Sequence, residues 1–111
     1  MKLVIAIFQP IQLPAVKRAL KEAGFANLSF TNILGTVPNM HERQLFRGVE
    51  HDITMFPKIR IEIAVGDESV DQLIDAMIEG GRASGGAGII LVTELHDFVI
   101  VKTGERGPTQ L

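Results

Sequence analysis

A glycine-rich segment in the second half of the chain could bind an anion. Residues Gly81 to Gly88 read GRASGGAG, and Arg82 carries its only charge. Glycines let backbone N–H groups turn toward an anion because no Cβ stands in the way. The segment does not end in Lys-Ser or Lys-Thr, so it is not a P-loop. Taken alone, it is better explained as a flexible turn. If it does bind an anion, Arg82, Lys102 and Arg106 could add positive charge.

Two histidine–carboxylate pairs could supply nitrogen and oxygen ligands to a metal. They are His41-Glu42 and His51-Asp52, which would have to meet by folding of the segment between them. Nothing in the sequence fixes their spacing, and the HExxH pattern is absent. No nucleophile–base pair or carboxylate dyad can be placed either. We therefore predict no metal site and no catalytic residues.

The segment from Gly35 to Phe56 is 22 residues long and shows no sustained hydrophobic period. Loops beyond roughly 12–15 residues are mostly functional or disordered, and binding residues concentrate on loops held by a rigid scaffold. We interpret this segment as a projecting arm. Leu45 and Phe46 could pack on the body or insert into a partner protein. Arg47 could reach a partner carboxylate or a phosphate.

The elements around the arm follow the order β-α-β, arm, β-α-β. The clearest strand signal is a period of two over residues 59–64, where isoleucine at 59, 61 and 63 alternates with Arg60, Glu62 and Ala64. The helix after it has an apolar stripe at helical spacing, a possible capping box beginning at Ser69, and a stop at Gly80-Gly81. The predicted strands are 3–8, 28–34, 58–65 and 89–92, with a possible short strand at 98–101, and the predicted helices begin at Leu13 and Val70.

This order predicts a ferredoxin-like α+β sandwich, with the helices on one face of an antiparallel sheet. Residues 3–8 and 89–92 are apolar at every position, so both faces of the sheet need cover. Self-association of the sheets would supply it. We therefore expect a single domain over residues 1–111 that forms a homo-oligomer.

Composition excludes several functional classes. Eleven basic and 13 acidic residues give no general footprint for nucleic acid. The absence of cysteine rules out disulfides and thiolate metal sites. The N-terminal apolar run is only as long as a strand, which is too short for a signal peptide or a membrane-inserted helix. We expect a cytoplasmic protein.

Several stretches resemble the nitrogen regulatory P-II signal proteins. They are MKLVIAIFQPIQLPAVKRALKEAG, LFRGVE, FPKIRIEIAV, DESVDQLIDAMIEGGR and VKTGERG, of which the last is the most specific. The resemblance covers nearly the whole chain. It implies a ferredoxin-like homotrimer that binds nucleotides in clefts between subunits and projects three T-loops, here residues 35–56. It also implies a glycine-rich B-loop at 80–88 and a functional C-terminal segment at 98–111.

The resemblance implies two sets of site residues. An adenine nucleotide (ADP, AMP or ATP) would be bound by Gly35, Thr36, Val37, Lys58, Arg82, Gly86, Ala87, Gly88, Ile89 and Lys102. A regulated enzyme or transporter would be bound by Leu45, Phe46, Arg47, Glu50 and His51 of the T-loop.

The chain departs from the family at several of these places. Three charges near the outer phosphates are replaced by Pro38, Ile89 and Ile100, although Lys58 and Lys102 keep theirs. Asn39 stands where the family has a glutamine that bridges Mg²⁺. We therefore expect ADP or AMP to bind at least as well as ATP, and Mg²⁺ and 2-oxoglutarate to bind weakly or not at all. The residues modified in some members are replaced by Val49 and His51.

Three functions remain open. The first is a P-II-like regulator in which a nucleotide changes the arm and so controls a partner protein. The second is a small enzyme on the same fold, since fold does not fix function. The third is a divergent relative with weak or no nucleotide binding that serves a transporter or a metal response. The missing phosphate ligands keep the third open, and nucleotide titration separates it from the first.

Overall fold

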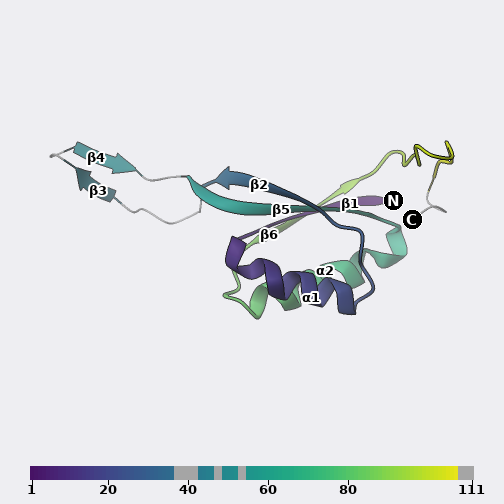
Figure 1. The fold of residues 1–111 in the computed structure, drawn as a ribbon, viewed down its shortest axis with the longest axis horizontal. Helices are drawn as coiled ribbons and strands as arrows, with labels where there is room; N and C mark the ends of the chain where they lie inside the picture. Colours follow the sequence, from purple (N-terminus) through teal and green to yellow (C-terminus); the bar gives the residue numbers. More distant parts are fainter. Residues whose placement is uncertain (37–42, 47–48, 53–54, 108–111) are drawn as a thin grey trace.

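The computed structural model describes residues 1–36 and 55–107, together with the backbone of residues 43–46 and 49–52. Four strands form an antiparallel sheet in the order β2-β5-β1-β6, and two helices pack together on one face of it (Figure 1). The predicted ferredoxin-like α+β sandwich is therefore confirmed. Its elements are β1 (Lys2–Phe8), η1 (Pro10–Gln12), α1 (Leu13–Glu22), β2 (Ser29–Gly35), β5 (Phe56–Val65), η2 (Asp67–Ser69), α2 (Val70–Arg82) and β6 (Ile89–Glu94).

The core lies between the sheet and the helices. Alternate residues of the two central strands point into it, because successive side chains of a strand face opposite sides of the sheet. The helices meet them with their apolar stripes, including the fully buried Val16, Leu20, Leu73 and Met77. From the strands come Val4, Ala6 and Phe8 of β1 and Ile59, Ile61, Ile63 and Val65 of β5.

In the described part of the chain, no helix covers the opposite face of the sheet (Figure 1). The strand register places Ile5 of β1 beside Leu91 of β6 and Glu62 of β5 on this face. Ile89 and Leu91 are about half exposed, at 54% and 49%. Arg60 and Glu62 form an ion pair at 2.8 Å on the same face. This open face is thus apolar over β1 and β6 and charged over β5. The sequence predicted apolar residues on this second face of the two apolar strands, and the structure places them there.

The glycine pair in α2 does not end the helix, so that prediction was wrong. The helix continues through Gly80 and Gly81 to Arg82, and both glycines are buried. A Cβ on Gly80 would lie 2.5 Å from the Cα of Val16, and one on Gly81 would lie 2.9 Å from the Phe8 ring. These glycines are therefore the points where α2 approaches α1 and β1 most closely.

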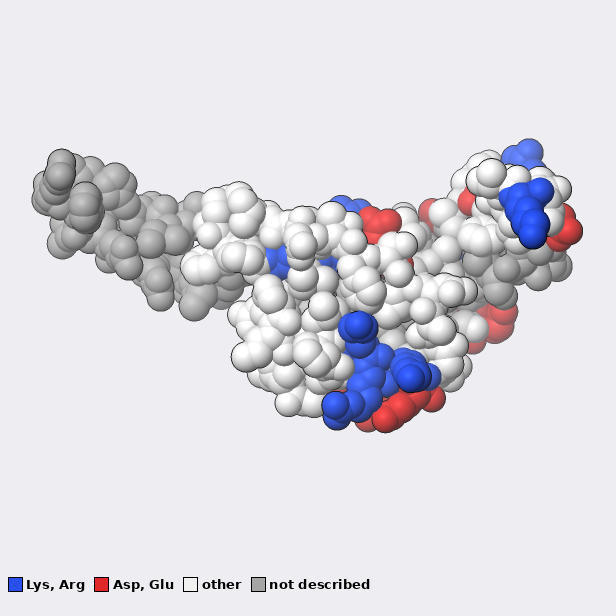
Figure 2. All heavy atoms as spheres, in the orientation of Figure 1, with Lys and Arg blue, Asp and Glu red and all other residues white. Residues whose placement is uncertain are grey.

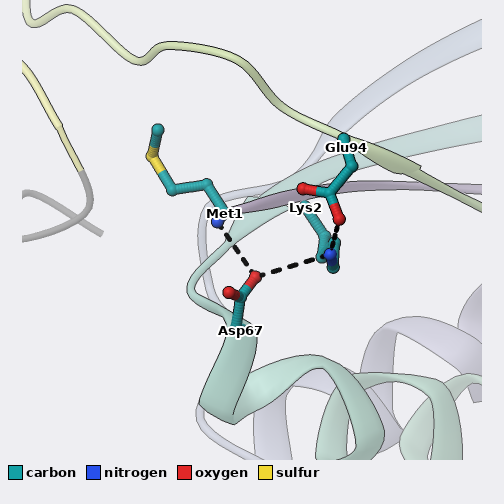
Figure 3. A network of polar contacts seen from close by, with 4 residues as sticks. All are labelled: Met1, Lys2, Asp67 and Glu94. Carbon is teal, nitrogen blue, oxygen red and sulfur yellow. Dashed lines mark hydrogen bonds and ion pairs between the residues drawn. The ribbon is translucent and has the colours of Figure 1, made fainter.

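α2 begins at Val70 as predicted, but the capping box predicted at Ser69 is not formed. Ser69 makes no side-chain capping hydrogen bond and is instead the last residue of the short helix η2, which leads into α2. Asp67 of η2 accepts a hydrogen bond of 2.9 Å from the N-terminal ammonium of Met1, and Lys2 pairs with both Asp67 and Glu94 (Figure 3). This network joins the beginning of β1 to the end of β6 and to the segment that leads into α2.

The segment predicted as an arm contains two short strands. β3 (Arg43–Phe46) and β4 (Val49–Asp52) pair antiparallel, with Phe46 opposite Val49. They form a separate two-stranded sheet and are not part of the four-stranded one. The arm thus has local strand structure that the hydrophobic pattern did not reveal.

The chain after β6 forms a small turn structure and not the short strand suggested for residues 98–101. A single bridge joins Val99 to Arg106, and the Gly107 N–H donates to the Phe98 carbonyl at 3.0 Å. Arg106 donates two hydrogen bonds to Asp97, which lowers the pKa of that carboxyl, and a backbone N–H bond from Phe98 lowers it further. We call residues 97–107 the C-terminal hairpin.

Candidate functional site

One end of the sheet, where the arm leaves, contains a hollow of about 350 Å³. This volume lies at the lower end of the roughly 300–1,000 Å³ typical of small-ligand pockets. Its lining comes from the ends of β1, β2, β5 and β6, which the register brings to one edge. The lining residues are Ile7, Phe8, Gln9, Thr36, Lys58, Ala87, Gly88 and Ile89. Five of the ten residues predicted to bind a nucleotide therefore line one hollow, which we call the arm-end hollow.

Lys58 supplies positive charge to this hollow and is held at the base of the arm. Its Nζ donates a hydrogen bond of 2.5 Å to the carbonyl of Thr36, the second residue of the arm. A Cβ on Gly35 would lie 3.2 Å from Cδ of Lys58, so the lysine stem lies against that glycine. Lys58 therefore links the hollow to the point where the arm begins.

The glycine-rich loop forms the other wall. A smaller hollow of about 200 Å³ lies behind this wall and is lined in part by Arg82 and Gly86; it shares Phe8, Ala87 and Gly88 with the arm-end hollow. The Gly86 N–H already donates to the Gly81 carbonyl at 2.9 Å. Gly88 has φ of +129°, and a Cβ there would lie 2.7 Å from the Phe8 ring. Only glycine fits at Gly88, and the loop can offer the N–H groups of residues 87 and 88 more readily than that of Gly86.

Two predicted cations lie at the opposite end of the sheet. Lys102 and Arg106 belong to the C-terminal hairpin, which follows β6 beyond Glu94 (Figure 1). β6 begins beside the arm-end hollow and runs away from it for six residues, a length of roughly 20 Å at about 3.3 Å per residue. Arg106 is engaged by Asp97, whereas Lys102 is exposed. One chain therefore does not bring Lys102 to the glycine-rich loop.

Several predicted site residues lie outside the described part of the chain. Val37 and Arg47 are not described, and neither are the side chains of Leu45, Phe46, Glu50 and His51 on β3 and β4. The side chains of the two histidine–carboxylate pairs, His41-Glu42 and His51-Asp52, are not described either. Among the described residues, no group of three or more potential ligands is placed to hold a metal ion.

Sequence reasoning missed Gln12. This side chain is fully buried, and its Nε2 donates to the carbonyls of Gly81 at 3.0 Å and Ala87 at 2.6 Å. It thus connects the start of α1 to the glycine-rich loop. In the sequence, Gln12 lies between Pro10 and Pro14 and looks like an exposed polar residue. Its position at the start of a predicted helix is the signal that could have suggested a structural role.

Charge is distributed unevenly over the molecule. On the face shown in Figure 2, basic side chains gather over the helix layer with acidic side chains beside them, and others lie on the C-terminal hairpin. The helix-layer group includes Lys17, Arg18 and Lys21, which line a separate surface hollow on α1. Lys58 is the charged residue among those that line the arm-end hollow. Among the described residues of one chain, Lys58 and backbone N–H groups could therefore bind an anion in that hollow.

The fold is that of the nitrogen regulatory P-II proteins. The model of that family, "Nitrogen regulatory protein P-II", matches residues 1–105, and the chain belongs to this family of signal transduction proteins. Nitrogen regulatory protein P-II of Rhodobacter capsulatus is 37% identical over 108 residues, which is 96% of each chain. GlnK1 of Methanosarcina mazei is 35% identical over 111 residues, 97% of this chain and 95% of the relative. GlnK of Escherichia coli K12 is 33% identical over 112 residues, the whole of both chains.

Within the described residues, no helix is long and apolar enough to cross a membrane.

Proposed function

We propose that this P-II protein binds an adenine nucleotide in the arm-end hollow, where a second copy of the chain completes the site. In this proposal the bound nucleotide changes the position of the arm, and the arm controls a partner protein such as an enzyme or a transporter. The observation that carries the proposal is the meeting of Thr36 and Lys58, at the base of the arm, with Ala87 and Gly88 of the glycine-rich loop around one hollow.

The hollow offers what a nucleotide requires. Ile7, Phe8 and Ile89 give it an apolar wall against which a base or ribose could pack. The ammonium group of Lys58 and the N–H groups of the glycine-rich loop suit a phosphate, since charge-assisted hydrogen bonds are roughly twice as strong as neutral ones. The lack of further described cations around the hollow favours a short phosphate chain, so ADP or AMP should bind at least as well as ATP.

The open face supports completion of the site by a second copy. The register places Ile7, Lys58 and Ile89 on this face, so the hollow opens toward it. A second copy that covered the apolar patch over β1 and β6 would also close the hollow. The C-terminal hairpin of that second copy could then bring its Lys102 to the hollow. Within a single chain, Lys102 lies at the far end of the sheet from the hollow. We propose a homotrimer on this basis.

Lys58 gives a route from the nucleotide to the arm. Its Nζ donates to the Thr36 carbonyl at 2.5 Å. A phosphate that accepted a hydrogen bond from Nζ would compete with that carbonyl. The nucleotide would then have different affinities for two positions of the arm, which is the condition for a ligand to shift a conformational equilibrium.

Calorimetric titration with AMP, ADP and ATP tests the proposal, each with and without Mg²⁺ and 2-oxoglutarate. We expect ADP or AMP to bind at least as tightly as ATP, with weak or no binding of 2-oxoglutarate. Lys58→Ala should weaken ADP, whereas Lys21→Ala, an exposed lysine on α1 that does not line the hollow, should not. If no adenine nucleotide binds, the divergent regulator with little nucleotide use becomes the better description.

Light scattering tests the assembly. We expect a trimer at micromolar concentration. Ile5→Glu places a charge in the middle of the open face without touching the hollow, and it should dissociate the trimer and weaken ADP binding with it. The exposed Ile11→Glu is the matched control, because Ile11 lies outside the sheet and is 75% exposed. A stable monomer of the unaltered protein would contradict the trimer.

A further inference from the structure

Gln12 is the buried polar residue of the described chain, and it does not line the arm-end hollow. A buried amide costs free energy unless its hydrogen bonds are made. Both ends of the amide are hydrogen-bonded: Nε2 donates to the carbonyls of Gly81 and Ala87, and Oε1 accepts from the Gln9 N–H at 2.8 Å. One side chain therefore joins three segments: the end of β1, the end of α2 and the glycine-rich loop.

The bond to Ala87 determines how the next peptide is oriented. No described peptide bond is cis, and in a planar trans peptide the C=O and the following N–H point in opposite directions. The Ala87 carbonyl points inward to Nε2 of Gln12 at 2.6 Å. The N–H of Gly88 must therefore point away from the Gln12 amide, and Gly88 lies in the wall that the arm-end hollow shares with the smaller hollow.

The sheet leaves this N–H free. The Leu95 N–H donates to the Met1 carbonyl, and antiparallel pairs alternate between bonded and non-bonded. Counting back along β6, the bonded pairs with β1 include Ile89 opposite Ile7. Gly88 is one residue earlier and lies outside β6. Among the described residues its N–H donates no backbone hydrogen bond, so the β1–β6 ladder does not use it.

We propose that Gln12 is a positioning residue for phosphate binding: it holds the Ala87–Gly88 peptide so that the Gly88 N–H faces a phosphate group of the nucleotide in the arm-end hollow. This inference rests on the proposed nucleotide site. A donor that is already oriented costs no reorganisation when the anion binds, which is the advantage of a preorganised site. Gln12 itself does not touch the ligand.

The test compares ADP with adenosine in Gln12→Met, a variant of similar size that cannot donate. We expect ADP to bind about tenfold more weakly, equivalent to about 1.4 kcal/mol, while the affinity for adenosine, followed by NMR chemical shifts, stays within twofold. A loss confined to the phosphate-bearing ligand separates a positioning role from a general loss of structure. Gln72→Met is the matched control. It removes a side-chain hydrogen bond of 3.1 Å from the Gln72 amide to the Ala23 carbonyl, between α2 and the end of α1.

A second variant keeps the test decisive if Gln12→Met folds poorly. Gln12→Asn retains the amide but is one methylene shorter, so it should reach only one of the two carbonyls and give an intermediate loss for ADP. Equal losses for ADP and adenosine, or unchanged ADP affinity in a folded variant, would overturn this inference alone. Failure of the unaltered protein to bind ADP would overturn both the inference and the proposed function.

Discussion

Replacing Gly80 by alanine tests the packing that places the glycine-rich loop. Alanine normally stabilises a helix interior relative to glycine by about 0.8–1.0 kcal/mol. Here the added Cβ would lie 2.5 Å from the Cα of Val16, 3.0 Å from its backbone nitrogen and 3.0 Å from the Ala15 carbonyl oxygen. These are backbone atoms of α1, so no side chain can rotate away, and the two helices would have to separate.

The expected magnitude follows from these opposing effects. Overpacking of a close contact typically costs about 1–3 kcal/mol, and a contact with backbone belongs at the upper end. Subtracting the gain in helix propensity leaves a loss of roughly 2 kcal/mol in the free energy of unfolding. Gly81→Ala is the matched comparison, because its Cβ would meet only the Phe8 ring, at 2.9 Å, and a ring can shift. It should lose much less.

Urea unfolding followed by circular dichroism, at one fixed protein concentration, measures both variants. A fixed concentration matters because the stability of an oligomer depends on it. A Gly80→Ala variant that is as stable as the unaltered protein, or more stable, would refute the predicted clash with the α1 backbone. An equal loss of unfolding free energy in Gly81→Ala would also refute it, because a contact with a side chain would then cost as much as a contact with backbone.

Two further predictions concern charge. Lys102→Ala should weaken ADP binding by roughly tenfold, equivalent to about 1.4 kcal/mol, and Lys21→Ala should leave it unchanged; calorimetry that finds both variants alike would show that Lys102 is not part of the site. The Met1 ammonium lowers the pKa of Asp67 through a hydrogen bond and through its charge. The stabilisation from this pair is therefore present at neutral pH. It is lost as pH falls through the lowered pKa, which lies below the usual value of about 3.9. The unaltered protein should therefore be more stable than Asp67→Asn at about pH 6 in urea unfolding, and the difference should shrink toward about pH 3; a difference that does not change with pH would contradict this assignment.

Most of the fold could be predicted because the strongest sequence patterns are also the ones that build the core. The alternation in β5 predicted both the strand and its buried face, and the apolar stripes predicted both helices. Errors arose where the same residue type serves two purposes. Gly80-Gly81 looked like a helix stop, but glycine also permits close helix packing, and only the position of α1 distinguishes the two. Ser69 matched a capping pattern, but η2 already continues the chain into α2.

The candidate site was less predictable because its parts are joined by tertiary contacts. The glycine-rich loop was recognised from composition, yet its orientation depends on Gln12, which is 75 residues from Ala87 in sequence. Pattern reasoning assigns a glutamine to the surface, because burial of a polar side chain becomes favourable only when the partners of its hydrogen bonds are known. The resemblance to the family predicted a set of site residues, but it did not include Gln12, which is hydrogen-bonded to the loop.

The position of Lys102 shows what the strand register adds to the sequence. Along the chain, Lys102 is only 14 residues after Gly88, a spacing that would allow both to contact one phosphate chain. In the fold, β6 lies between them and runs the length of the sheet, and Leu95 is still hydrogen-bonded to the beginning of β1. The hydrogen bonds within the C-terminal hairpin hold Lys102 beyond the end of β6, so the hairpin as folded does not reach the arm-end hollow of its own chain. If both residues bind the same nucleotide, they must come from different copies, so the loss of ADP affinity in Lys102→Ala and the loss in Ile5→Glu test one and the same assembly.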